Sequence, residues 1–321
     1  MSVSCEVCGS LGAFSSFQAA EKMFGMGGSF TYARCAECDT LFLVDVPVDL
    51  GQYYPSYYYS FSSATVKQGW MSKLKVFLWD ERLRALNRSA IGARQLLHFF
   101  PNAGMDALIK LQPKREWDIL DVGCGAGDLV RALRKQGFSK AIGADAFVQA
   151  DVYHDGSLLV KKAQPQDLTG RFDLIMLHHA FEHMPKPHDQ LQMLHALLKP
   201  GGKLLLRFPT VSSEAFERYG VNWVQLDAPR HLFLHSEKGM RLLAKQNGFE
   251  VNDFYTDAID FQFWGSEWYA QGGSLFDSSS GKAIPAKKQF GAHALRKMKA
   301  ETQLLNQHHR GDQAVWVLQK K

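Results

Sequence analysis

One short stretch, residues 117–129, constrains the fold of this chain more than any other. It begins with the apolar run Ile119-Leu120-Asp121-Val122, which favours a buried strand, and continues with glycines at positions 123, 125 and 127. Alternate glycines favour a tight turn in which the backbone can approach a ligand. A helix with apolar residues on one face is predicted to follow over 129–136, capped by Asp128 and stopped by Gly137. A strand, a glycine turn and a helix in this order are typical of nucleotide binding.

The spacing of the glycines distinguishes between nucleotides. A dinucleotide fingerprint of the form G-x-G-x-x-G needs a glycine at position 128, where this chain has Asp128. The G-x-G-x-G pattern found here, with an acid two residues before it, resembles motif I of the class I S-adenosylmethionine (SAM) dependent methyltransferases. The resemblance implies that Asp121 orients the methionine ammonium end of SAM and that Gly123, Gly125 and Gly127 admit the adenosine. A glycine-rich turn of an unrelated α/β protein remains the alternative.

Strands and helices are predicted to alternate after this turn, which favours a mostly parallel sheet. The further predicted strands are residues 140–145, 158–160, 172–179, 203–208, 249–255 and 313–318. We therefore predict an α/β fold with a Rossmann-like, seven-stranded, mostly parallel sheet whose last strand is antiparallel, together with a small N-terminal zinc ribbon. The resemblance to methyltransferases covers roughly residues 117–255, including the Pro-Gly-Gly turn at 200–202.

Polar residues at the ends of these strands are candidate cofactor ligands. Asp145 follows the last glycine of the turn by eighteen residues, and its carboxylate can accept both ribose hydroxyls. Gln164 stands where related enzymes usually place an Asp to meet the adenine amino group. His178 or His179 can line the methionine half of SAM, and His179 is a second candidate for the catalytic base. The sequel Ala180-Phe-Glu-His-Met184 resembles the stretch after strand four of small-molecule O-methyltransferases, including the ubiquinone-type enzymes.

Four histidines between positions 178 and 188 raise the question of a metal site. They show no clean ligand spacing with a supporting carboxylate, so no metal is expected among them.

The acceptor is predicted to enter after the fifth strand, near residues 223–232. Trp223 and Asp227 offer an aromatic wall and a carboxylate, and Arg230 can clamp a phosphate or carboxylate. His231 is the first candidate for the general base, because an unperturbed imidazole has a pKa of about 6.5. The alternative is an ordered loop in which Asp227, Arg230 and His231 satisfy one another.

An insertion, residues 256–312, is predicted between the last two strands. Its first half, 261–269, is aromatic and polar like a carbohydrate-facing wall, with Trp264 and Glu267 as candidate acceptor contacts. Residues 278–281 are a predicted flexible break, and a basic helix is predicted from Lys287. We interpret the insertion as an acceptor lid, and a mere cover is the alternative.

Four of the five cysteines form two C-x-x-C pairs in the first 40 residues. Two such pairs supply four thiolates for one tetrahedral structural zinc: Cys5, Cys8, Cys35 and Cys38. Disulfides are the weaker alternative, and a site filled by four thiolates holds a fold together without doing chemistry. Cys124, inside the glycine turn, is predicted to be a small packing residue.

The domain organisation follows as a zinc ribbon over 1–45, an aromatic linker and basic helical segment over 46–115, and a SAM-binding domain over 116–321. The linker contains an aromatic tract at 52–61 that can stack on sugars or bases or simply pack. A basic amphipathic helix at 70–87 can rest on a membrane surface or cover a neighbouring domain.

Composition bounds the class of protein and its partners. The chain is 46% hydrophobic and 21% charged, contains no membrane-spanning apolar run and does not begin like a secretory signal, so a cytoplasmic location is expected. Residues 67–115 and 282–321 each carry a net charge of +7. Such basic flanks suggest a phosphate-bearing partner, namely a nucleotide sugar, a lipid headgroup surface or RNA, with solvated helix faces as the alternative.

The sequence as a whole resembles zinc-ribbon-bearing methyltransferases of sugar and cell-surface polysaccharide pathways. The resemblance implies SAM as methyl donor and a small-molecule acceptor methylated on oxygen or carbon. An RNA methyltransferase is the first alternative, although residues 178–183 lack the Asn/Asp-Pro-Pro-Tyr type of motif often used on exocyclic base amines. A scaffold that keeps the fold without catalysis is the second.

Overall fold

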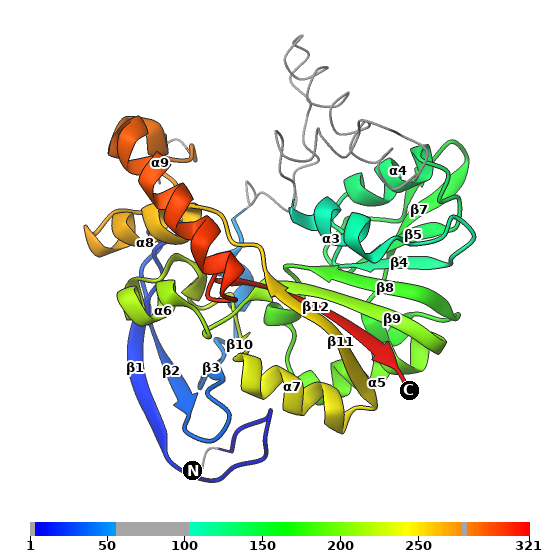
Figure 1. The fold of residues 1–321 in the computed structure, drawn as a ribbon, viewed down its shortest axis with the longest axis horizontal. Helices are drawn as coiled ribbons and strands as arrows, with labels where there is room; N and C mark the ends of the chain where they lie inside the picture. Colours follow the sequence, from blue (N-terminus) through cyan, green and yellow to red (C-terminus); the bar gives the residue numbers. More distant parts are fainter. Residues whose placement is uncertain (1–3, 56–102, 278–280) are drawn as a thin grey trace. The chain divides into compact units, whose positions relative to one another are not determined.

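The computed structural model describes residues 4–55, 103–277 and 281–321 (Figure 1). These residues form two compact units: unit 1 contains residues 4–55, 179–192 and 206–318, and unit 2 contains the described part of 56–178 together with 193–205 and 319–321. Most of the predicted aromatic tract, the predicted basic helix at 70–87 and most of the predicted break at 278–281 lie outside the described residues.

Unit 2 is built on the parallel strands that surround the glycine turn. Its strands occur in the order β9-β8-β4-β5-β7-β6, namely β4 (Ile119–Val122), β5 (Ala141–Asp145), β6 (Val152–His154), β7 (Ser157–Lys162), β8 (Phe172–His178) and the first part of β9 (Leu198–Pro209). The pairs β4–β5, β4–β8 and β5–β7 are parallel. Every residue of β4 is buried, which explains why its apolar run does not alternate with polar residues.

A short antiparallel strand, β6, extends this sheet beyond the seven predicted strands. It pairs with β7 across a two-residue turn, Asp155-Gly156, in which both residues have positive φ. An Asp-Gly pair between two extended segments favours this type of hairpin turn, so the sequence did contain the signal for β6.

The helix after the glycine turn, α4 (Asp128–Lys135), begins one residue earlier than predicted. Its N-cap is Gly127, in the left-handed conformation, and no side chain caps it. The predicted capping role of Asp128 is therefore wrong: this residue opens the first turn and pairs with Arg131. The predicted stop at Gly137 is confirmed by its φ of 93°, a conformation that glycine adopts without strain.

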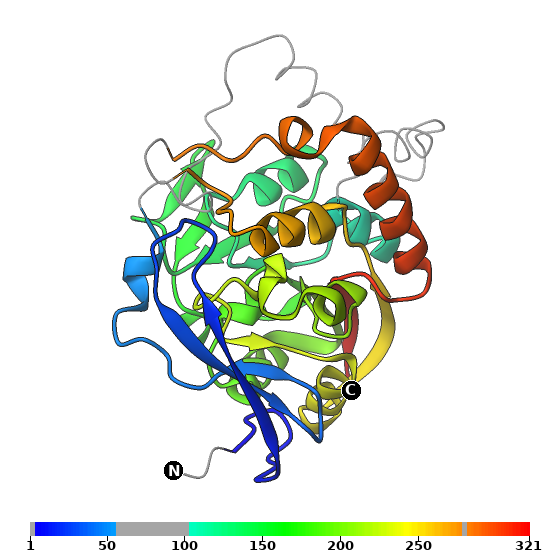
Figure 2. The same cartoon turned by 90° about the vertical axis from the view of Figure 1, so that its left-hand side faces the viewer.

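The N-terminal part of unit 1 is a small antiparallel sheet with the strand order β1-β2-β3-β10. It contains β1 (Phe14–Ala20), β2 (Ser29–Cys35), β3 (Leu41–Leu43) and β10 (Phe233–Leu234). The hairpin of β1 and β2 is seen as the blue pair of strands in Figure 2. The fourth strand comes from far along the chain, where Phe233 pairs with Phe42 and Leu234 with Leu41.

The remainder of unit 1 carries the end of β9 with two neighbouring strands, β12 (Gln313–Lys320) and β11 (Phe249–Thr256). In the sheet these two strands are neighbours, and the residues between them along the chain are those of the predicted insertion. The helices with residues in this unit are α5 (Pro187–Leu197), α6 (Glu214–Tyr219), α7 (Glu237–Gln246), α8 (Phe261–Ala270) and α9 (Ala286–Gln307). Ser236 caps α7, accepting a hydrogen bond from the Gly239 N–H at 2.8 Å.

The insertion is anchored by hydrogen bonds within unit 1. Gln262 of α8 donates to the Thr302 hydroxyl of α9 at 3.0 Å, and the Asn306 side chain bonds to both backbone groups of Ala258. Helix α9 contains the basic residues predicted from Lys287, but it is broken by the non-helical Gly291. In the ranges described, no helix combines the length and apolar character needed to cross a membrane.

Candidate functional site

The glycine turn of unit 2 depends on backbone conformations that favour glycine. Gly123, Gly125 and Gly127 have φ values of 74°, 55° and 79°. A Cβ atom at position 127 would lie 2.5 Å from a methyl carbon of Val160 in β7. The absence of side chains therefore keeps the turn close to the sheet and lets its backbone approach a ligand closely.

Asp145 ties the turn to the end of β5. One of its carboxylate oxygens accepts the Gly125 N–H at 2.9 Å, and the other accepts the Phe147 N–H at 2.8 Å. Each carboxylate oxygen has a second lone pair, so these bonds leave capacity for two ribose hydroxyls. The residues present thus fit the nucleoside half of SAM.

Asp121 is 3% exposed, and its environment favours the neutral acid. Burial, reinforced by the negative charge of Asp145, raises the pKa of Asp121 to about 8. A cationic group bound beside Asp121 would lower its pKa again, which suits a residue predicted to pair with the ammonium group of SAM. Burial also raises the pKa of the Cys124 thiol, and Cys124 lies against Gly143, which suits the predicted packing role and not a nucleophile.

The other predicted cofactor residues of unit 2 lie at the ends of its strands. Gln164 is exposed, and its N–H donates to Asp167 at 3.2 Å at the start of a short 3-10 helix, Pro165–Asp167. His178 is partly buried at the last position of β8. Their roles towards SAM stay predictions.

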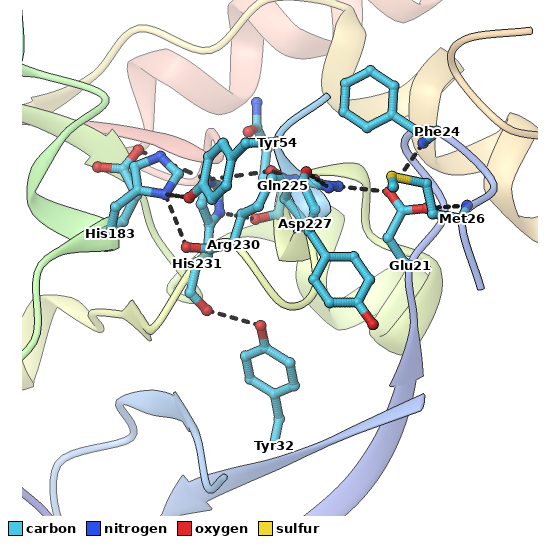
Figure 3. Close-up of polar contacts among 12 residues, drawn as sticks. Glu21, Phe24, Met26, Tyr32, Tyr54, His183, Gln225, Asp227, Arg230 and His231 are labelled. Atoms are coloured by element: carbon cyan, nitrogen blue, oxygen red, sulfur yellow. Dashed lines mark hydrogen bonds and ion pairs between the residues drawn. The ribbon is translucent and has the colours of Figure 1, made fainter. Parts of the chain in front are cut away.

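A second group of polar residues, in unit 1, is buried around Arg230 (Figure 3). The Arg230 side chain has no exposed surface; its guanidinium donates to Glu21 at 2.7 Å, to Asp227 at 2.6 Å and to the Tyr53 carbonyl at 2.9 Å. Glu21 also accepts the Phe24 and Met26 N–H groups. The N–H donors of Arg230 are thus used within the protein. The geometry therefore favours the alternative in which the polar residues of this loop bond to one another, and it disfavours a role for Arg230 in binding an acceptor phosphate.

Two histidines lie beside this arginine. The Nδ1 atom of His183 bonds to the Arg230 carbonyl, and that of His231 bonds to the Gln225 carbonyl, both at 2.8 Å. The two rings meet edge to face with centroids 4.7 Å apart. Their neighbour Glu182 is fully buried; burial raises its pKa, but the nearby histidines outweigh this effect and lower it to about 2. We call these six residues the buried polar cluster: Glu21, Glu182, His183, Asp227, Arg230 and His231.

The second predicted base, His179, is engaged at both ring nitrogens. Its Nδ1 atom lies 3.5 Å from Glu182, and its Nε2 atom contacts the guanidinium of Arg207, which also binds Asp257. His231 differs, since its Nδ1 atom alone is held by the backbone and its Nε2 atom lies 3.8 Å from Asp227.

The predicted acceptor contacts have mixed environments. Trp223 is fully buried and donates its indole N–H to Asp312 at 3.0 Å. Trp264 is partly buried against Phe261, and Glu267 accepts the Tyr219 hydroxyl at 3.4 Å. Trp223 and Asp227 line a small, partly open pocket. Contact of these residues with an acceptor stays a prediction.

The four paired cysteines converge as predicted, with Sγ atoms 3.6 Å apart for Cys5 and Cys38 and 3.5 Å apart for Cys8 and Cys35. One ligand atom from each of the four lies within 4.8 Å of the others, and all four thiols are free of disulfides. A tetrahedral zinc with Zn–S bonds of about 2.3 Å places its sulfurs about 3.8 Å apart, so the donor set fits this ion.

The sheet of parallel strands, the turn of three left-handed glycines and the acid at the end of β5 together define a class I SAM-dependent methyltransferase fold. The chain belongs to the family described as a methyltransferase domain, whose family model matches residues 81–253, more than half of the sequence.

Curated relatives carry a more specific description. The chain is 28% identical over 151 residues to a ubiquinone biosynthesis O-methyltransferase of Pseudomonas aeruginosa (strain LESB58), a match that covers 42% of this chain and 65% of that protein. It is 34% identical over 110 residues to the Coxiella burnetii (strain Dugway 5J108-111) protein of the same description, covering 29% and 43%. The chain thus spans less than two thirds of the length of these relatives.

Solved structures with a similar fold include a putative methyltransferase in complex with the Trm112 methyltransferase activator of Haloferax volcanii. That chain is 18% identical to this one, with a TM-score of 0.46, and the match covers 75% of this chain and 96% of that chain. A SAM-dependent methyltransferase from Mesorhizobium loti is 14% identical, with a TM-score of 0.44, and the match covers 68% of this chain and 99% of that chain.

Sequence reasoning missed two features of the buried polar cluster. Glu21 has no local motif around it, and only the three-dimensional structure brings it to Arg230. Glu182 and His183 lie in the stretch 180–184 that resembles small-molecule O-methyltransferases. Their convergence with His231 could not be predicted from spacing, because the two histidines are 48 positions apart.

Proposed function

We propose that this protein transfers a methyl group from SAM to a hydroxyl oxygen of a small-molecule acceptor, with a sugar or a polysaccharide-pathway intermediate as the favoured acceptor. The observation that carries the proposal is the glycine turn, flanked by the buried Asp121 and by Asp145. The O-methyltransferase description of the curated relatives supports oxygen as the acceptor atom. The sugar acceptor rests on the resemblance of the whole sequence, zinc ribbon included, to enzymes of those pathways.

SAM would supply an electrophilic methyl group on its sulfonium, and the chain would bind and orient it. Asp121 would pair with the methionine ammonium group, Asp145 would accept the ribose hydroxyls, and the glycines would admit the adenosine to the backbone. Holding donor and acceptor in line accounts for much of the acceleration of such a displacement, because it removes the entropy cost of alignment.

The acceptor hydroxyl must lose a proton during the transfer. His179 is poorly suited to take it, because both of its ring nitrogens already have partners. His231 retains a lone pair on Nε2, since Nδ1 carries the proton donated to the Gln225 carbonyl. This lone pair can accept either a proton or a metal ion.

The four-cysteine cluster has a structural part in this proposal. Zinc bound by four thiolates has no open position for a water or a substrate, so it would stabilise the N-terminal sheet of unit 1 and take no part in the chemistry.

Calorimetric titration with SAM tests the donor site. We expect micromolar binding by the wild-type protein and at least a tenfold loss in Asp145→Asn, which weakens the ribose contact. Asp155→Asn is the matched control, because Asp155 lies in the exposed β6–β7 turn and accepts only from the neighbouring His154. A folded protein that binds no SAM would contradict the proposal.

The acceptor class is tested with methyl-labelled SAM. Label is expected in nucleotide sugars or polysaccharide precursors, and an equal rate on polyphenols would shift the acceptor towards the ubiquinone type. An RNA acceptor would instead show salt-sensitive complexes at two salt concentrations.

A further inference from the structure

We propose that Glu182, His183 and His231 form a binding site for a divalent transition-metal ion in unit 1. The site is distinct from the four-cysteine cluster, and its existence does not depend on methyl transfer. Residue spacing does not reveal this site, because one of the three ligands lies far along the chain from the other two.

The three side chains converge from two segments that the backbone ties together. Glu182 and His183 belong to the 3-10 helix Phe181–His183, and the Leu232 N–H next to His231 donates to the Glu182 carbonyl at 2.8 Å. One ligand atom from each residue lies within 4.8 Å of the others, and the His231 Nε2 atom is 4.0 Å from a Glu182 oxygen. Two imidazoles and one carboxylate are a donor set used by zinc and other first-row divalent ions.

Backbone carbonyls fix the tautomer of both histidines. Each carbonyl can only accept, so the Nδ1 atoms of His183 and His231 carry the protons donated to Arg230 and Gln225. Nε2 of each ring is then the nitrogen with a free lone pair. Metal-binding histidines in proteins show this arrangement, in which the other ring N–H is bonded to a carbonyl or a carboxylate.

Glu182 provides the independent observation that a cation belongs here. Its side chain is fully buried, and the nitrogens that face its carboxylate, His179 Nδ1 at 3.5 Å and His231 Nε2 at 4.0 Å, are too far away for strong hydrogen bonds. A buried carboxylate with such weak partners is costly, and a metal ion would compensate its charge.

Metal binding would require only a small movement of the three side chains. Metal–ligand bonds of about 2.0–2.2 Å place neighbouring ligand atoms about 3–3.5 Å apart, so the side chains would move together by roughly 1 Å. Three protein ligands leave coordination positions open for water or another oxygen donor. In the metal-bound protein His231 is a ligand and not a general base, because both roles use the same lone pair.

Mn²⁺ is the probe of choice, because thiolates select zinc while carboxylate and imidazole sites accept manganese. Full-length protein with zinc in the cysteine cluster is titrated with Mn²⁺ and followed by electron paramagnetic resonance. One bound Mn²⁺ per chain is expected, with spin-echo modulation from imidazole nitrogen. Absence of binding, or binding without a nitrogen signal, would overturn the proposal without recourse to any variant.

Variants then identify the ligands. Glu182→Gln and His231→Gln are each expected to weaken Mn²⁺ binding at least tenfold. Glu237→Gln and His308→Gln are the matched controls, since both residues are at least partly exposed and lie away from the three ligands, and they should bind as the wild type does. SAM titration serves as a separate readout of folding and of the donor site, so failure of the proposed methyl transfer and failure of the metal site give different results. Unchanged Mn²⁺ affinity in folded Glu182→Gln would refute the assignment.

Discussion

The glycine turn of unit 2 and the buried polar cluster of unit 1 are assembled in opposite ways. The turn is one continuous stretch, and its form comes from backbone conformations with positive φ. The cluster consists of side chains from three distant segments, around positions 21, 182 and 230, and its form comes from buried charges that compensate one another. The first kind of site is visible in a sequence and tolerates change poorly at single glycines. The second is invisible locally and depends on the whole of unit 1.

The largest difference is expected when the four-cysteine cluster can no longer hold a metal ion. Cys5→Ser/Cys8→Ser removes two of four thiolates and should eliminate most of the about 10–16 kcal/mol that a structural zinc supplies to such small domains. We expect loss of the thiolate-to-metal charge-transfer absorption of the cobalt-substituted protein and fast hydrogen exchange in β1 and β2. Cys124→Ser, a change in the glycine turn, should keep both signals; a protected β1 in the double variant would show that the cluster does not depend on metal.

The buried ion pair is expected to give the next largest effect. Glu21→Gln leaves the fully buried Arg230 with a weaker partner and should cost about 3 kcal/mol of unfolding free energy, because the uncompensated charge cannot be solvated. Glu237→Gln makes the same chemical change in an exposed pair with Arg241 and should cost less than about 1 kcal/mol. Denaturant titration compares the two, and equal costs would mean that the cluster is not charge-compensated as described.

The glycine turn is tested by adding a single methyl group. Gly127→Ala should cost about 2–3 kcal/mol, since it combines backbone strain with a clash against Val160. Gly156→Ala has a similar φ of 73° but no atom within 4 Å of the added carbon, so it should cost only about 1–2 kcal/mol of backbone strain. SAM affinity should fall in the first variant and not in the second. Similar affinities would mean that close approach to β7 is unimportant for the donor site.

The last comparison concerns the charge of Asp121. Its pKa is raised to about 8 in the free protein, so below that pH it is protonated and must release the proton to pair with an ammonium group. SAM affinity should therefore rise with pH, by up to tenfold per unit between pH 6 and 8, and level off above. Calorimetry in buffers of different ionisation enthalpy measures the proton release. Asp121→Asn should abolish it, and release that persists in this variant would assign the proton to another group.

The same shift has a consequence for folding. Because the folded pKa of Asp121 lies above the value of an exposed aspartate, the neutral acid favours the folded state. That contribution is complete below about pH 4 and is lost as the pH rises through about 8. Asp121→Asn should therefore flatten the decline in stability between about pH 4 and 8.

Much of unit 2 could be predicted from the sequence because its signals are local. The turn and the strand ending in Asp145 follow from residue spacing alone. The same holds for the four-cysteine cluster, although it lies in unit 1. The cap of α4 was wrong because a left-handed Gly127 displaces the expected Asp128. In unit 1, by contrast, the partners of Arg230 and His231 depend on how distant segments meet, which spacing does not reveal.

The pairing of β10 with β3 has a consequence for how the chain is made. Leu41 and Phe42 are synthesised about 190 residues before their partners, Phe233 and Leu234. Until those residues leave the ribosome, β3 presents an unpaired edge with free N–H and C=O groups, which invites pairing with other nascent chains. The small sheet of unit 1 is thus begun about 190 residues before its last strand is translated. A chain truncated before β10 should show this vulnerability as aggregation during expression.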